Sequence, residues 1–101
     1  GETADVIEHD GIILNMKNAS LYFDGENIEL TKNEYKILEI LLKNKGKMTS
    51  RENLMMGLWN TDSFVDENTL TVNMTRLRKK LAEHGISDLI KTKKGLGYIV
   101  E

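Results

Sequence analysis

The chain has 101 residues, of which 40% are hydrophobic and 30% are charged, and its formal net charge is -2 at pH 7. This length suits a single small domain with one modest core. The sequence has no apolar run near the ~20 residues that a membrane-spanning helix requires, and without cysteine it excludes a disulfide framework and a thiolate metal site.

Residues 1–5 lack the basic start and apolar stretch of a signal peptide, and we expect them to be a linker or tag remnant. Residues 6–30 contain four short β-branched runs, two separated by Asp10-Gly11 and two by Asp24-Gly25. Asp-Gly between alternating apolar residues is a strong signal for a β-hairpin. The sequence therefore predicts a small antiparallel sheet over residues 6–30, serving as a platform for helices or as a docking face for a partner domain.

Two helices are predicted next, each from a capping box. The first box runs from Thr31 to Glu34 and precedes apolar residues at helical spacing, which are Tyr35, Leu38, Leu41 and Leu42. The second box runs from Thr49 to Glu52 and precedes an apolar face of Leu54, Met55 and Leu58. Two helix starts so close together predict a helix–turn–helix, followed by a polar loop from Trp59 to Asp66.

A third helix is predicted from about Asp66 to His84, which completes a three-helix bundle over residues 31–85. On a helical wheel, Leu70, Met74, Leu77 and Leu81 form one apolar stripe. The opposite arc carries Asn68, Val72, Thr75, Arg76 and Lys79, with Arg78 and Lys80 toward its edges. One face of this helix is therefore predicted to pack on the core, while the other presents cations.

Positive charge is concentrated in this region although the whole chain is acidic. Residues 68–94 contain seven Lys or Arg and only two acids, and four of the cations lie within residues 76–80. An ordinary solvated face is the alternative interpretation of such a run, but solvated helix faces usually mix charges of both signs. The other positions are short, namely Thr71, Val72, Asn73 and Thr75, and Val72 and Thr75 are able to touch a thymine methyl group.

Residues 89–101 predict a C-terminal β-hairpin with a turn at residues 94–97, and it carries a second basic cluster of Lys91, Lys93 and Lys94. A helix fits the major groove of B-DNA, and a basic hairpin beside it can reach phosphates or the adjacent minor groove. The two features together predict binding to double-stranded DNA.

Three segments resemble the effector domain of OmpR/PhoB-type response regulators: "LTKNEYKILEILLKNKGKMTSRENLMMGLW", "VDENTLTVNMTRLRKKL" and "IKTKKGLGYIV". The resemblance extends nearly end to end. It implies an α+β winged helix–turn–helix over residues 6–101, with an N-terminal four-stranded antiparallel sheet, three helices and a C-terminal β-hairpin wing. It implies a sequence-specific DNA-binding effector domain of a cytoplasmic two-component transcriptional regulator, similar to members that answer cell-envelope stress or cationic peptide antibiotics.

The same resemblance implies roles for individual residues. Arg76 is the expected base reader, with Val72 and Thr75 beside it. Phosphate contacts are expected from Asn68, Asn73, Arg78 and Lys79, and backbone contacts from Trp59 and Thr92. Lys94 stands at the wing tip, where the family often has an arginine that enters the minor groove. The other expected DNA-binding residues are Thr71 on the third helix and Lys93 and Gly95 on the wing. Tyr98 either packs under the wing or touches a phosphate.

The family also implies partners beyond this chain. A missing N-terminal receiver domain is expected to be phosphorylated by a sensor histidine kinase and to dimerise, so that a weak monomer becomes a tandem dimer on direct repeats. The loop at residues 59–67 is expected to contact RNA polymerase. Trp59 has a second interpretation, which we favour, as the residue that closes the hydrophobic core.

Other functions fit the sequence less well. A winged helix that binds proteins and not DNA is the main alternative, since the loop at residues 59–67 is acidic and aromatic. We expect no enzyme activity, no membrane association and no cofactor or metal. His9 and His84 lack companions at metal-ligand spacing, and "KKGLGY" lacks the context of a nucleotide-binding loop.

Overall fold

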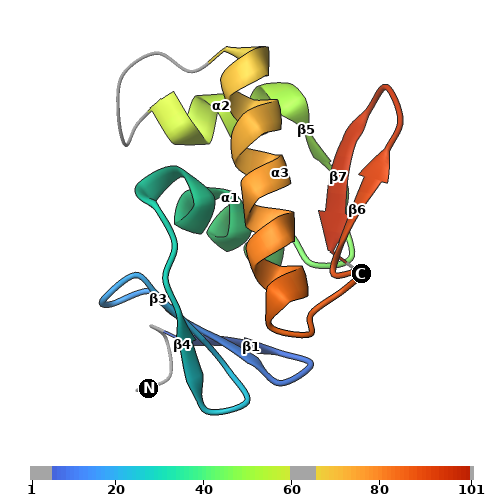
Figure 1. Cartoon of the computed structure of the whole chain (residues 1–101). Coiled ribbons are helices and arrows are strands. Elements are labelled where there is room, and N and C mark those ends of the chain that lie inside the picture. The colour runs from blue at the N-terminus through green and yellow to red at the C-terminus, as the bar shows by residue number, and fades with distance from the viewer. Residues whose placement is uncertain (1–5, 60–65, 101) are drawn as a thin grey trace.

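Four short strands, β1 Val6–His9, β2 Ile12–Asn15, β3 Ser20–Phe23 and β4 Glu26–Ile28, form an antiparallel sheet in that order. The computed structural model describes residues 6–59 and 66–100, so the predicted linker at residues 1–5 lies outside the described residues (Figure 1). The turns at Asp10-Gly11 and Asp24-Gly25 have positive φ at both positions, 49° and 84° in the first and 53° and 79° in the second. Type I′ turns require this backbone, which Gly and Asp tolerate. The predicted sheet is confirmed.

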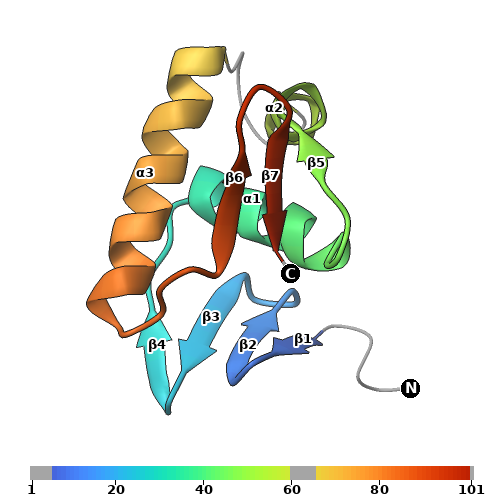
Figure 2. The same cartoon turned by 90° about the vertical axis from the view of Figure 1, so that its right-hand side faces the viewer.

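Alternate residues of this sheet face the helices. Ile12, Leu14, Leu21 and Ile28 are buried, whereas Ile13 between two of them is exposed. The sheet lies below α1 and the C-terminal end of α3, which agrees with the first of its two predicted roles, a platform for the helices (Figure 2). The period-2 alternation of its strands decides which face is covered.

Helix α1, Lys32–Lys43, begins at the predicted capping box. The Glu34 backbone N–H donates to the Thr31 hydroxyl at 3.2 Å, and the Glu34 carboxylate accepts from the Thr31 N–H at 2.9 Å. Its buried apolar residues are Ile37, Leu38, Leu41 and Leu42, while Tyr35, predicted for the core, is only partly buried against it. The chain then turns through Gly46, whose φ is 86°.

Helix α2, Arg51–Trp59, does not begin at the second predicted capping box. The hydroxyl that accepts from the helix belongs to Ser50, which receives the Asn53 N–H at 3.1 Å. Thr49 and Ser50 instead form a two-residue strand, β5, in which Thr49 pairs with Tyr98. The predicted box was wrong because α2 begins at Arg51, one residue later than that box requires, so the capping hydroxyl is that of Ser50 and not of Thr49. The predicted apolar face is confirmed, with Leu54 and Leu58 buried and Met55 partly buried.

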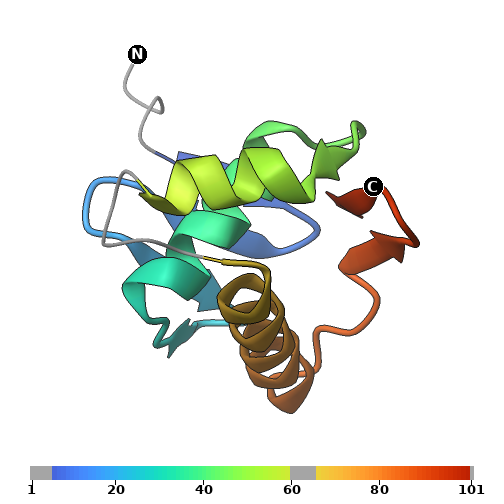
Figure 3. The same ribbon diagram turned by 90° about the horizontal axis from the view of Figure 1, so that it is seen from above.

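Helix α3, Glu67–Glu83, has the predicted bounds within one residue. The Asp66 carboxylate accepts from the Thr69 N–H at 2.8 Å and caps its start, and the chain leaves it through Gly85, whose φ is 87°. The predicted apolar stripe is confirmed, because Leu70, Met74, Leu77 and Leu81 are all buried. Viewed from above, the three helices pack together with the C-terminal strands at their side (Figure 3).

The C-terminal hairpin consists of β6 Ile90–Lys93 and β7 Gly97–Val100, and we call residues 90–100 the wing. The hairpin belongs to a three-stranded sheet with the order β5-β7-β6. A Cβ atom on Gly97 would lie 2.0 Å from the Thr49 carbonyl oxygen, so β5 can approach β7 only at a glycine. The predicted hairpin is confirmed, and its third strand is new.

Within residues 6–59 and 66–100, none of the helices combines the length and the apolar character that crossing a bilayer would need. No group of three or more His, Asp or Glu side chains in the same residues is placed to hold a metal ion.

Candidate nucleic-acid interface

One side of α3 faces solvent along most of its length. We call this side the outer face; its residues are Asn68, Thr71, Val72, Thr75, Arg76 and Lys79, all exposed. It follows from the helical period, since burying the apolar stripe turns the opposite positions outward. Its two cations stand among short side chains and one exposed valine. The structure therefore brings six of the predicted DNA-binding residues onto one continuous surface.

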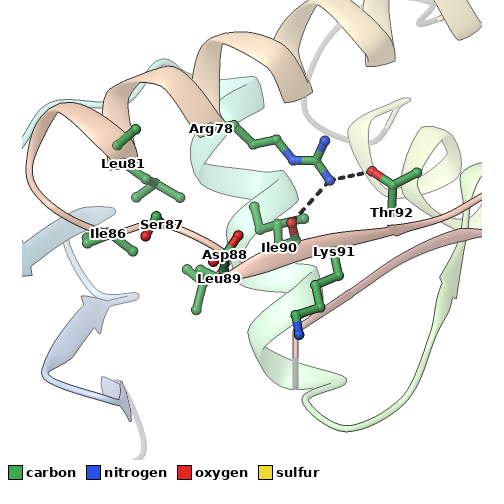
Figure 4. Close-up of a pocket in the computed structure, with 10 residues that line it drawn as sticks. Arg78, Leu81, Ile86, Ser87, Asp88, Leu89, Ile90, Lys91 and Thr92 are labelled. Atoms are coloured by element: carbon green, nitrogen blue, oxygen red, sulfur yellow. Dashed lines mark hydrogen bonds between the residues drawn. The ribbon is translucent and has the colours of Figure 1, made fainter.

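Arg78, predicted to lie at or near a phosphate, turns away from the outer face toward the wing. Its Nη2 atom donates to the Ile90 carbonyl at 3.1 Å and to the Thr92 hydroxyl at 2.5 Å. Its guanidinium carbon lies 5.5 Å from the centre of the Tyr98 ring, within the range of a cation–π contact. Figure 4 shows this side chain crossing from α3 to β6. These contacts hold α3 and the wing side by side.

Lys80 turns to the opposite flank of α3, toward the N-terminal sheet. Its Nζ atom lies 2.6 Å from the Glu34 Oε1 atom and donates to the Glu29 carbonyl at 3.2 Å. Glu34 is only 1% exposed, and the same carboxylate caps α1. Two of the four cations within residues 76–80 thus have partners inside the protein, which leaves Arg76 and Lys79 on the outer face.

The structure places Asn73 and Tyr98 inside the protein. Asn73 is 8% exposed and donates its side-chain amide to the Thr69 carbonyl at 2.8 Å, so burial argues against the predicted phosphate contact. Tyr98 is 5% exposed and lies under Arg78, which favours the first of its two interpretations, packing beneath the wing. Both side chains therefore lie beneath the exposed surface and pack against the elements that carry it.

The wing presents a second basic surface. Lys91, Thr92, Lys93, Lys94 and Gly95 are all exposed. Leu96 at the same turn is 61% exposed and was not among the predicted DNA-binding residues. The sequence could have predicted this exposure, because an apolar residue between two glycines of a hairpin turn lies too far from the core to be buried. The wing tip therefore combines cations with one apolar side chain.

Trp59 does not close the hydrophobic core, and that prediction was wrong. It is the last residue of α2, and its side chain is 57% exposed. Met56 on the same helix is 61% exposed. Leu54 and Leu58 supply the buried face of α2. Residues 60–65 of the predicted polymerase-binding loop lie outside the described residues, so the structure places only the two ends of that loop.

An acid stands at the start of α3. Hydrogen bonds from Thr69 hold the pKa of the Asp66 carboxyl below its usual range. A carboxylate at this position also complements the positive end of the helix dipole. Asp66 is therefore the N-cap of α3.

A groove runs between the C-terminal half of α3 and β6, below the Arg78 bridge (Figure 4). It has a volume of about 640 Å³, and its lining includes Leu81, Ile86, Leu89 and Lys91. A second, smaller groove of about 320 Å³ continues from it toward the β1–β2 turn at His9 and Asp10. Side chains of α3 and β6 thus meet closely at Arg78 and leave space beyond it.

Comparison with known proteins agrees with this architecture. Residues 25–100 match the family described as "Transcriptional regulatory protein, C terminal". The chain is 46% identical over 93 residues to the transcriptional regulatory protein YxdJ of Bacillus subtilis (strain 168), and the match covers 92% of this chain and 41% of YxdJ. The chain thus spans about two fifths of the length of such curated relatives.

Two solved structures are similar over almost the whole chain. The C-terminal domain of NsrR, a lantibiotic response regulator for nisin resistance, is 41% identical with a TM-score of 0.81, covering 93% of this chain and 95% of NsrR's. The DNA-binding domain of the response regulator AdeR, in complex with an intercistronic region, is 28% identical with a TM-score of 0.83, covering 94% and 97%. The fold is therefore the one expected from the resemblance.

Proposed function

The chain belongs to the family of C-terminal domains of transcriptional regulatory proteins, the winged helix–turn–helix effector domains of OmpR/PhoB-type response regulators, and on this premise we propose that it binds double-stranded DNA sequence-specifically. The observation that carries the proposal is the common exposure of the outer face of α3 and the lysines of the wing, on two elements that Arg78 joins. The similarity to AdeR, which is solved on DNA, supports the same function.

The proposed contacts follow from the shapes of the two partners. Helix α3 enters the major groove, where Arg76 reads a base edge and Val72 and Thr75 contact thymine methyl groups. Lys79 and Asn68 contact phosphates on the flanks of the groove. The wing lysines reach phosphates or the adjacent minor groove, and as ammonium groups they neutralise charge without the planar fork of arginine.

We further propose that this chain acts within a longer regulator. The chain matches only 41% of YxdJ, and in our proposal a receiver domain that a sensor histidine kinase phosphorylates lies in the part of the regulator outside this chain. Its dimerisation raises the effective concentration of two weak DNA-binding domains at direct repeats. The protein acts in the cytoplasm, where the chromosome lies, and the similarity to NsrR supports a role in cell-envelope stress or cationic peptide resistance.

Protein binding is a second proposed role, at a different surface. Met56 and Trp59 are exposed at the end of α2, and Trp59 is also the first residue of the predicted polymerase-binding loop at residues 59–67. Exposed aromatic and methionine side chains are enriched at protein interfaces. We propose that RNA polymerase contacts this end of the domain while α3 and the wing are on DNA.

A gel shift on random duplex DNA at low salt tests DNA binding, and selection from a random duplex library then identifies the site. With ~4–6 phosphate contacts, the slope of log K against log salt should be about -4 to -5. The selected duplex should bind more tightly than random duplex at every salt concentration. Absence of any shift at low salt would contradict the proposal and leave a protein-binding module.

A further inference from the structure

We propose that Arg78 is a positioning residue, which sets the separation between α3 and the wing and so fixes how the two elements reach DNA together. The inference rests on the proposed function, because it assigns the geometry of that same interface. It differs from the phosphate contact expected from the sequence. In our proposal Arg78 acts on DNA through the wing.

The contacts of the Arg78 side chain are within the protein. One nitrogen, Nη2, donates to two acceptors on β6, the Ile90 carbonyl and the Thr92 hydroxyl, while the guanidinium plane lies over Tyr98 of β7. The Nε atom is buried and has no hydrogen-bond partner among the described residues. A planar guanidinium can donate and stack at the same time, which a lysine ammonium cannot do.

The position of β6 explains why this contact matters. In the order β5-β7-β6, strand β6 is one of the two outer strands, and outer strands leave backbone groups without a ladder partner. Arg78 supplies a donor to one such carbonyl, that of Ile90. On its other side the wing is fixed by main-chain pairing of β7 with β5. The bridge from Arg78 therefore fixes the side of the wing that faces α3.

Packing alone does not close this seam. The groove of about 640 Å³ opens between α3 and β6 immediately beside Arg78. An open seam allows the strand to shift relative to the helix unless a directional contact holds it. The two hydrogen bonds and the ring contact of Arg78 are directional contacts of this kind, and they hold β6 in place against α3.

Arg78→Lys and Thr92→Val test the proposal on DNA. Arg78→Lys keeps the charge and loses the fork and the ring contact, while Thr92→Val keeps the shape and loses the acceptor. Each single substitution should lower the affinity for the selected duplex about 5- to 10-fold and leave the salt slope unchanged. The double variant should have the same affinity as the single variant that binds less tightly, as expected for residues that act as one unit. Independent losses that multiply in the double variant would overturn the proposal.

Lys79→Ala is the matched comparison on DNA, since it removes an exposed cation one position away. It should lower affinity and flatten the salt slope by about 1 unit, the signature of a phosphate contact. Both Arg78→Lys and Thr92→Val should keep the wild-type circular dichroism spectrum. If Arg78→Lys does not fold, a measurement of the distance between α3 and the wing decides on Thr92→Val alone, because a direct contact of Thr92 with DNA would not change the geometry of the free protein.

A distance measurement on the free protein separates this inference from the proposed function. Because the chain has no cysteine, spin labels can be placed at Thr71→Cys on α3 and Leu96→Cys at the wing tip. The distribution of distances between them should broaden or shift in Arg78→Lys and in Thr92→Val. An unchanged distribution in both would overturn the inference. A wild-type protein that fails to shift random duplex would overturn the proposed function instead, and the distance measurement would still decide the role of Arg78.

Discussion

The outer face of α3 and its two flanks carry the same kinds of side chain in different surroundings. Arg76 and Lys79 stand exposed among short residues, whereas Arg78 binds the wing and Lys80 binds a buried carboxylate. All four lie within five consecutive residues. A run of cations thus divides into two that are open to a partner and two that fix the helix carrying them.

The largest effect on stability is expected at the flank that faces the N-terminal sheet. Lys80→Met leaves the Glu34 carboxylate buried without its cation. Loss of a partner for a buried acceptor costs about 1–3 kcal/mol, and the free energy of unfolding should fall in the upper part of that range because the group is charged. Urea denaturation measures the change.

Lys79→Met is the control for Lys80→Met, because it removes the same charge from the same helix. Lys79 is exposed and belongs to the outer face, so its substitution should change the free energy of unfolding by less than about 0.5 kcal/mol. Equal losses in the two variants would erase the distinction between flank and outer face.

The largest effect on binding is expected at Arg76. Arg76→Ala removes the proposed base contact and should weaken the selected duplex by about 1–3 kcal/mol, with a relaxed preference at the contacted base pair. Stability should not change, since the side chain is exposed. Affinities for selected and random duplex are compared by gel shift. Equal losses on both duplexes would make Arg76 a phosphate contact.

Much of the local structure could be predicted from the sequence. The capping box at Thr31, the Asp-Gly turns and the apolar stripe are local patterns with one structural solution each, and all were predicted. Asn73 was also accessible, since it lies three residues after Leu70 and four before Leu77, on the buried side of the wheel. The family resemblance, and not the wheel, led to the predicted phosphate contact.

The partners of Arg78 and Lys80 were beyond a local pattern. The wheel puts both cations at the edges of the outer face, but it says nothing of what approaches those edges. Glu34 lies 46 residues from Lys80, and Thr92 lies 14 residues from Arg78. Strand β5 was missed for the same reason, because two residues carry no period and its partner β7 is far along the chain.

A smaller effect is expected at the wing tip. Lys94→Ala should weaken binding to all duplexes alike and flatten the slope of log K against log salt by about 1 unit. Lys17→Ala is the matched control, since Lys17 is exposed in the β2–β3 turn of the N-terminal sheet and its loss changes the net charge equally. Salt titrations of both variants decide: a slope that responds equally to both substitutions would mean that the wing is not on DNA.

The smallest effect concerns the acid that begins α3. Hydrogen bonds from Thr69 lower the pKa of Asp66 in the folded protein, so folding favours its carboxylate form. The stability that this provides is present above the unfolded-state pKa of about 3.9 and is lost as pH falls through the lower folded-state pKa. Asp66→Asn keeps a side-chain oxygen that caps helices well but does not titrate. The difference in Tm between the wild type and Asp66→Asn should therefore be constant from pH 7 to 5 and should shift against the wild type below pH 4. A difference that stays constant down to pH 3 would show that the charge on this cap contributes nothing to holding α3 in place.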